Sequence, residues 1–146
     1  MVDEKIIREW LNKAEEDFCF ASLNLANHSN TFFTQICFHF QQAAEKYLKT
    51  YIVACELSFR RIHDLPELLK ICQAHQSSFS KLKKACEFLT DFYVDTRYPV
   101  HWPTEISRDE AEMAQQMAGE IRDFVKGAII NHRKKRRRLQ NIQGGS

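Results

Sequence analysis

FHFQQAAEKYLKTYI, residues 38–52, lies in a stretch where apolar residues return every three or four positions. This spacing is the period of one face of an α-helix. It predicts a helix from about Thr31 to Cys55. Its expected apolar face consists of Phe33, Ile36, Phe40, Ala44, Tyr47, Tyr51 and Cys55.

The same periodicity predicts four more helices, and no segment alternates apolar and polar residues as a half-buried strand would. These helices are expected after Asp3, from Asp64, over about Ser78–Asp95 and from Ser107. Capping residues support three of the starts: Asp3, Asp64 with Glu67, and Ser107 with Glu110. The sequence therefore predicts an all-α protein: an antiparallel four-helix up-and-down bundle with an extra short helix in its middle connection, five helices in total.

The side of the 31–55 helix opposite its apolar face carries a polar stripe. At 100° per residue the stripe contains His39, Gln42, Glu45, Lys46 and Lys49. Glu45 and Lys49 stand four apart in the order that favours an ion pair. The spacing alone favours a solvated face. The alternative is a carboxylate and an ammonium that line a ligand cleft or a dimer seam.

The loop in FLTDFYVDTRYPVHWPTE, residues 88–105, is rich in functional groups. Its two prolines disfavour helical geometry in the residues before them. Between and beside the prolines stand Arg97, Tyr98, His101 and Trp102. Arginine binds phosphate in a bidentate manner, and histidine acts as an acid or a base near neutral pH. The alternative is structural: the aromatic rings cap the core and Arg97 pairs with a carboxylate such as that of Asp95.

Composition excludes several classes of protein. The 146 residues fit one domain, no apolar run has the length of a membrane span, and the charged first residues do not resemble a signal peptide. We therefore expect a cytoplasmic protein. The five cysteines form no CxxC pair, and Cys72 with His75 forms only half of a zinc-type pattern. We expect no disulfide, no metal and no cofactor.

The basic residues are unevenly distributed. RKKRRR, residues 133–138, holds 6 of the 21 basic residues, which leaves 15 basic against 19 acidic residues elsewhere. We expect a domain over residues 1–132 and a basic, disordered tail over 133–146, whose first part frays from the last helix. Such a run is either a solvated tail or a clamp on nucleic-acid phosphates. A clamp on about five phosphates predicts a salt slope near −3.5 for single strands. The candidate nucleic-acid-binding residues are Arg133, Lys134, Lys135, Arg136, Arg137 and Arg138.

Four segments together resemble the HEPN domain family: WLNKAEEDF (10–18), FHFQQAAEKYLKTYI (38–52), HDLPELL (63–69) and FLTDFYVDTRYP (88–99). The resemblance implies a five-helix bundle that is usually dimeric and is often encoded beside a minimal nucleotidyltransferase in a toxin–antitoxin-like pair. Many members are metal-independent ribonucleases marked by an arginine, four to six residues and a histidine. No arginine and histidine here have that spacing; Arg97 and His101 are separated by three residues.

Three functions follow from these observations. The first is a HEPN module that partners a nucleotidyltransferase or binds a nucleotide or RNA, with Glu45, Lys46, Lys49 and Tyr98 as ligand-binding candidates. The second is a metal-independent endoribonuclease with Arg97 and His101 as catalytic residues. The third is a purely structural dimerisation domain. In each case we expect a homodimer, because Phe32, Phe38 and Tyr51 lie off the main apolar stripe.

Overall fold

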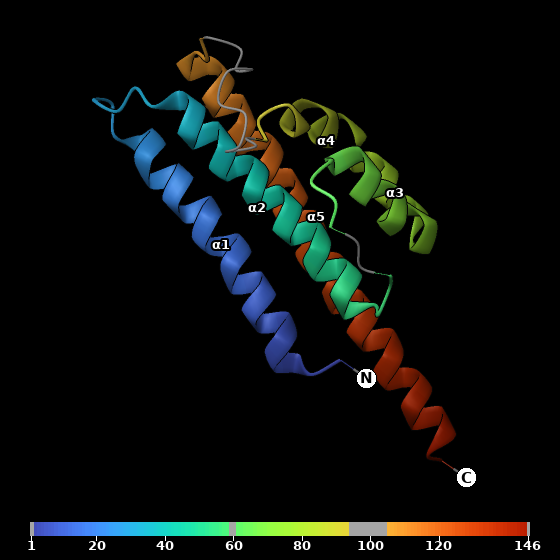
Figure 1. Cartoon of the computed structure of the whole chain (residues 1–146). Coiled ribbons are helices and arrows are strands. Elements are labelled where there is room, and N and C mark those ends of the chain that lie inside the picture. The colour runs from blue at the N-terminus through green and yellow to red at the C-terminus, as the bar shows by residue number, and fades with distance from the viewer. Residues whose placement is uncertain (1, 59–60, 94–104, 146) are drawn as a thin grey trace.

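The computed structural model describes residues 2–58, 61–93 and 105–145 of the chain. Within these ranges the fold is helical and has no strand (Figure 1). The predicted all-α bundle of five helices is thus confirmed. The elements are α1 (Glu4–Ala26), α2 (Phe33–Ala54), α3 (Leu65–His75), the 3₁₀ helix η1 (Ser77–Leu82), α4 (Lys83–Thr90) and α5 (Arg108–Gln143).

Contacts at the helix ends define the directions of the long helices. α1 and α5 are antiparallel, because Glu4 pairs with Arg133 at 2.8 Å while the Arg108 guanidinium donates to the Leu25 carbonyl at 3.0 Å. α2 and α5 run in the same direction. Arg108 lies over the Phe33 ring at one end, and Arg136 pairs with Glu56 at the other. Figure 1 shows the three long helices side by side.

The connection between α2 and α5 contains a short helical hairpin. At one end of it the Leu65 amide at the start of α3 donates to Thr90 Oγ1 at the end of α4, at 3.1 Å. At the other end His75 meets Tyr51 of α2. The helices α1, α2, α4 and α5 therefore alternate in direction, and α3 is the extra short helix that the sequence predicted.

α2 forms the centre of the bundle, in contact with α1, α3, α4 and α5. Tyr47 and Tyr51 are fully buried. The side chains where the long helices approach each other are small, since a methyl group lets two backbones come close. Fully buried alanines occupy positions 14, 21, 43, 44, 111, 114 and 118.

Three helix starts have the caps that the sequence predicted. The Asp3 side chain accepts from the Lys5 amide, and that of Asp64 accepts from the Glu67 amide. Ser107 and Glu110 form a reciprocal capping box at the start of α5. These side chains satisfy amide groups that have no partner within the helix.

Two predicted boundaries differ from the structure. The segment expected as one helix over Ser78–Asp95 is a 3₁₀ turn followed by a short α4 that ends at Thr90. α5 continues to Gln143, so residues 133–143 are helical rather than disordered. Arginine and lysine are strong helix formers, and ion pairs from Arg133 and Arg136 anchor the run to the body. The end of α5 projects beyond the other helices (Figure 1).

Among the described residues, none of the helices is both long enough and apolar enough to cross a bilayer.

Candidate functional site

The basic run on α5 is divided between two sides of the helix. With 3.6 residues per turn, three arginines face one way and the remaining three cations face the other. The first side carries Arg133, Arg136 and Arg137, and the second carries Lys134, Lys135 and Arg138. Arg133 and Arg137 line one pocket, the second side lines another, and Arg136 lies at the border and lines both.

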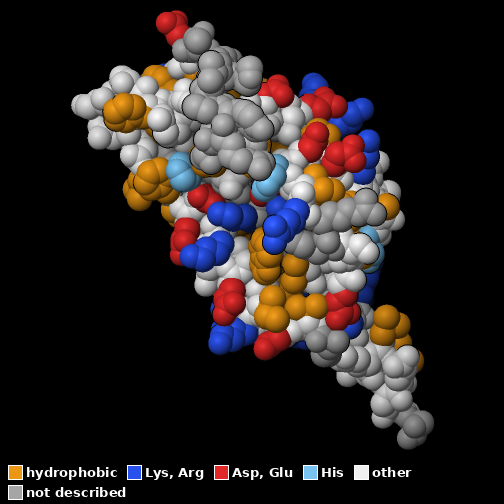
Figure 2. Space-filling view, in the orientation of Figure 1, with side chains coloured by type: hydrophobic (Ala, Val, Ile, Leu, Met, Phe, Trp, Pro, Cys, Tyr) orange, Lys and Arg blue, Asp and Glu red, His pale blue; other side chains and the backbone are white. Residues whose placement is uncertain are grey.

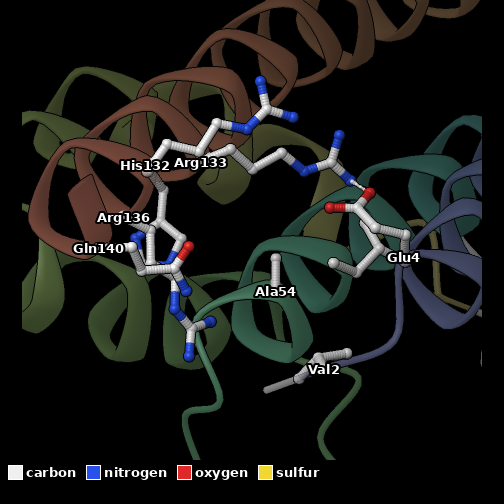
Figure 3. Close-up of a pocket in the computed structure, with 9 residues that line it drawn as sticks. Val2, Glu4, Ala54, His132, Arg133, Arg136 and Gln140 are labelled. Carbon is white, nitrogen blue, oxygen red and sulfur yellow. Dashed lines mark ion pairs between the residues drawn. The ribbon is translucent and has the colours of Figure 1, made fainter. Parts of the chain in front are cut away.

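The first pocket, of about 180 Å³, lies where α5 meets the start of α1 and the end of α2 (Figure 3). Val2 and Ala54 form its apolar wall. The Arg133 guanidinium pairs with the Glu4 carboxylate at 2.8 Å, and Arg136 pairs with Glu56 at 3.3 Å. Carboxylates of the body thus neutralise part of the positive charge on this side.

The second pocket is larger, about 480 Å³, and lies between α5 and the end of α3. Lys134, Lys135 and Arg138 line it, and all three are exposed. His75 and His132 also line it. The arrangement is an electropositive groove, which we call the α5 groove. Clustered lysine and arginine side chains of this kind attract phosphate groups.

The wall of the α5 groove contains a hydrogen-bonded group of polar side chains. The Tyr51 hydroxyl lies 2.7 Å from His75 Nδ1 and donates to Gln76 Oε1 at 3.2 Å. The rings of His75 and His132 lie 5.8 Å apart between centroids. Burial, followed by the charges of His75 and Arg136, lowers the pKa of His132 below the usual histidine value. Burial raises the pKa of the neighbouring Cys55 thiol.

A second charged cluster lies inside the fold. Glu45 is 4% exposed and Lys49 is 6% exposed. The Lys49 ammonium donates to Glu45 Oε2 at 3.1 Å, and His63 Nδ1 lies 3.0 Å from Glu45 Oε1. The prediction that the α2 stripe is a solvated face is therefore wrong for these two residues. The extended segment before α3, to which His63 belongs, lies against this side of α2.

Other polar residues of the α2 stripe contact α1. Asp17 accepts a hydrogen bond from Lys46 through one carboxylate oxygen, and its other oxygen lies 2.9 Å from His39 Nδ1. Gln42 donates to its neighbour Gln41 at 2.7 Å. Figure 2 shows histidine, basic and acidic side chains gathered on this face of the molecule. Partners within the chain thus satisfy the charges of the stripe, and a ligand-binding role for Glu45, Lys46 and Lys49 stays a prediction.

The predicted loop residues Arg97, Tyr98, His101 and Trp102 lie outside the described residues. The described chain resumes only at Glu105, and it stops at Tyr93. The Tyr93 ring stacks on His63, with 4.4 Å between centroids and 12° between planes. Tyr93 therefore lies beside His63, which contacts the buried Glu45 carboxylate. Their catalytic or binding roles stay predictions.

Sequence reasoning missed the residues that α2 and α3 contribute to the groove. It noted His75 as half of a zinc pattern with Cys72, but Cys72 is buried and directs its thiol at the Leu48 carbonyl, at 3.8 Å. The neighbours of His75 are instead Tyr51 and His132. Only the direction of α3 relative to α2 and α5 brings these side chains together, and no spacing in the sequence encodes it.

Comparison with known proteins identifies the family. The HEPN domain profile matches residues 7–128, most of the chain. The crystal structure of TT1696 from Thermus thermophilus is similar, with a TM-score of 0.71 and 29% identity over 83% of this chain and 96% of that chain. The structure of ST0689, an archaeal HEPN homologue, shares the fold, with a TM-score of 0.66 and 23% identity over 84% of this chain and 97% of that one. No curated protein sequence matches. The basic run lies beyond the matched region. The profile match shows that the chain belongs to the HEPN domain family.

Proposed function

We propose that this HEPN protein is a nucleic-acid-binding module that holds single-stranded RNA by its phosphates in the α5 groove. The observation that carries the proposal is the continuation of α5 through the basic run. A rigid helix presents Lys134, Lys135 and Arg138 on one side, exposed and next to His75. A helix fixes the spacing of these charges, so less conformational entropy is lost on binding than with a disordered tail.

The charge distribution indicates which part of the molecule a nucleic-acid strand would bind. Outside residues 133–138 the chain has 15 basic and 19 acidic residues, so the body repels a polyanion weakly while the end of α5 attracts it. The strand is expected to run along the groove. Contacts of this type depend on phosphate rather than on base, and we expect little sequence preference.

Charge removal in the groove tests the proposal. The variant carries Lys134→Gln, Lys135→Gln and Arg138→Gln, substitutions that keep a good helix former at each position. Removal of about three phosphate contacts should reduce the magnitude of the salt slope for RNA binding by about 2. Fluorescence anisotropy with a generic labelled RNA across a salt series measures that slope.

The matched control removes the same charge from another surface. Lys81, Lys83 and Lys84 are exposed on η1 and α4, and their triple glutamine variant should leave the salt slope unchanged. Equal slopes for wild type and the groove variant would refute the proposal. An equal reduction of the salt slope in the groove and control variants would show that RNA binding depends only on the net charge of the protein.

We further propose that the module acts as a homodimer and, in the cell, as the partner of a minimal nucleotidyltransferase. Support for a second copy comes from exposed apolar side chains at one end of α1 and α2: Phe20, Leu23 and Phe32 are 50%, 74% and 67% exposed. Tyr51, which the sequence analysis assigned to this surface, is fully buried instead. Light scattering should give a dimer for wild type and a monomer for Leu23→Glu. A wild-type monomer at micromolar concentration would contradict this.

The ribonuclease alternative rests on Arg97 and His101, whose separation falls short of the spacing that marks the family's nucleases. We propose binding with weak cleavage or none. Any cleavage should persist in EDTA and fall in Arg97→Ala and His101→Ala. Robust cleavage that both variants retain would place the active site elsewhere.

A further inference from the structure

The geometry points to a metal site formed by Cys55, His75 and His132, which would hold a zinc-type divalent ion. The three residues come from three places in the chain: the C-cap of α2, the last residue of α3 and the distal part of α5. One ligand atom from each lies within 4.8 Å of the other two. This inference is independent of RNA binding, and two of the three side chains, His75 and His132, line the α5 groove.

The donor set suits zinc. One thiolate sulfur and two imidazole nitrogens are typical zinc ligands, and a site with three protein ligands leaves the fourth tetrahedral position for water. In a tetrahedral zinc site such ligand atoms lie roughly 3.3–3.8 Å apart, so the side chains must draw together by up to about 1.5 Å. Cys55 and His132 are partly exposed and His75 is exposed, which leaves these side chains room to move and gives the ion a path from solvent.

The surroundings of both imidazoles suit this role. His75 Nδ1 is occupied by the Tyr51 hydroxyl at 2.7 Å, which leaves Nε2 as its metal-binding atom. A histidine that binds a metal through one ring nitrogen commonly uses the other ring nitrogen for a hydrogen bond of this kind. His132 Nε2 is buried and has no hydrogen-bond partner among the described residues. A buried nitrogen without a partner is uncommon in folded proteins, and a bound ion would satisfy it.

The local charges favour an ion whose fourth coordination position is not filled by a protein side chain. The Cys55 thiolate offsets one of the two charges of the ion, and Glu56 pairs with the nearby Arg136 at 3.3 Å. Lys135 and Arg136 line the same pocket as the two histidines. These cations reduce the affinity for a divalent ion to some extent, and they favour an anion or hydroxide at its fourth position.

Cobalt substitution tests the site. Co²⁺ added to the full chain should bind in a 1:1 ratio, with visible d–d bands of tetrahedral geometry and a sulfur-to-metal charge-transfer band, and Zn²⁺ should displace it. Cys55→Ser should abolish the charge-transfer band, and His132→Asn should weaken binding more than about tenfold. Tyr51→Phe, which removes the contact to His75, should weaken binding about tenfold.

Cys19→Ser is the matched control, because Cys19 is an exposed thiol on α1, outside the proposed ligand set. It should leave the spectrum and affinity unchanged. Circular dichroism of each variant without metal verifies the fold, and His132→Asn provides a second test if Cys55→Ser fails to fold. A wild-type spectrum without a charge-transfer band, or a band that survives in Cys55→Ser and disappears in Cys19→Ser, would overturn the assignment. RNA binding measured in EDTA stays a separate test of the α5 groove.

Discussion

Glu45→Gln should destabilise the fold by about 3 kcal/mol, because it breaks a buried ion pair. The side chains of Glu45 and Lys49 are 5% and 8% exposed, and the hydrogen bond between them is 3.1 Å long. His63 adds a second contact to the same carboxylate at 3.0 Å. Water cannot replace a carboxylate at this depth. Removal of the charge therefore costs far more than removal of a surface charge.

Urea unfolding followed by far-ultraviolet circular dichroism measures the effect. Addition of Lys49→Met to Glu45→Gln should recover at least about 1 kcal/mol, because the second substitution removes the buried ammonium. Glu16→Gln is the matched control. Glu16 pairs with Lys13 at 3.4 Å with both side chains 67% exposed, and its loss should cost less than about 1 kcal/mol. A cost for Glu45→Gln as small as that of the control would refute the buried-pair argument. It would instead support the interpretation of the α2 stripe as a solvated face.

Four further predictions test the packing, capping and titration of the fold. Ala118→Leu should cost about 1–3 kcal/mol in urea unfolding, since the alanine is fully buried. Gly127→Ala should instead stabilise α5 by up to about 1 kcal/mol, because among the described residues no atom beyond the adjoining backbone of α5 lies within 4 Å of the added Cβ; a loss would contradict this. Ser107→Ala should cost about 1 kcal/mol through the capping box. Because the pKa of His132 is lowered, the unfolded chain binds the proton first as the pH falls, so stability should decrease below a pH of about 6.5 and decrease less in His132→Asn.

The sequence predicted those parts of the fold that depend on one helix at a time. Periodicity placed the five helices, and Asp3, Asp64 and Ser107 predicted three starts because a cap is a local interaction. The basic tail was expected to fray from the last helix and to be disordered. The sequence could not show that Glu4 of α1 would pair with Arg133 and help to hold the helix.

Burial and side-chain clusters that depend on several helices were not predictable in this way. Glu45 and Lys49 lie on the polar side of α2, and nothing in the period of that helix shows that another segment covers them. His75 and His132 come close only because α3 and α5 run in the same direction beside α2. Spacing along one helix indicates the face on which a residue lies, but it does not indicate which other segments pack against that face.

An NMR titration of the isotope-labelled protein with a short single-stranded RNA tests the central claim most directly. The account predicts that amide shifts concentrate on residues 131–139 of α5 and on His75 and Gln76, which line the same groove, and that they weaken as salt is added. Shifts that concentrate instead around Asp17, His39 and Lys46, with the end of α5 unchanged, would contradict it.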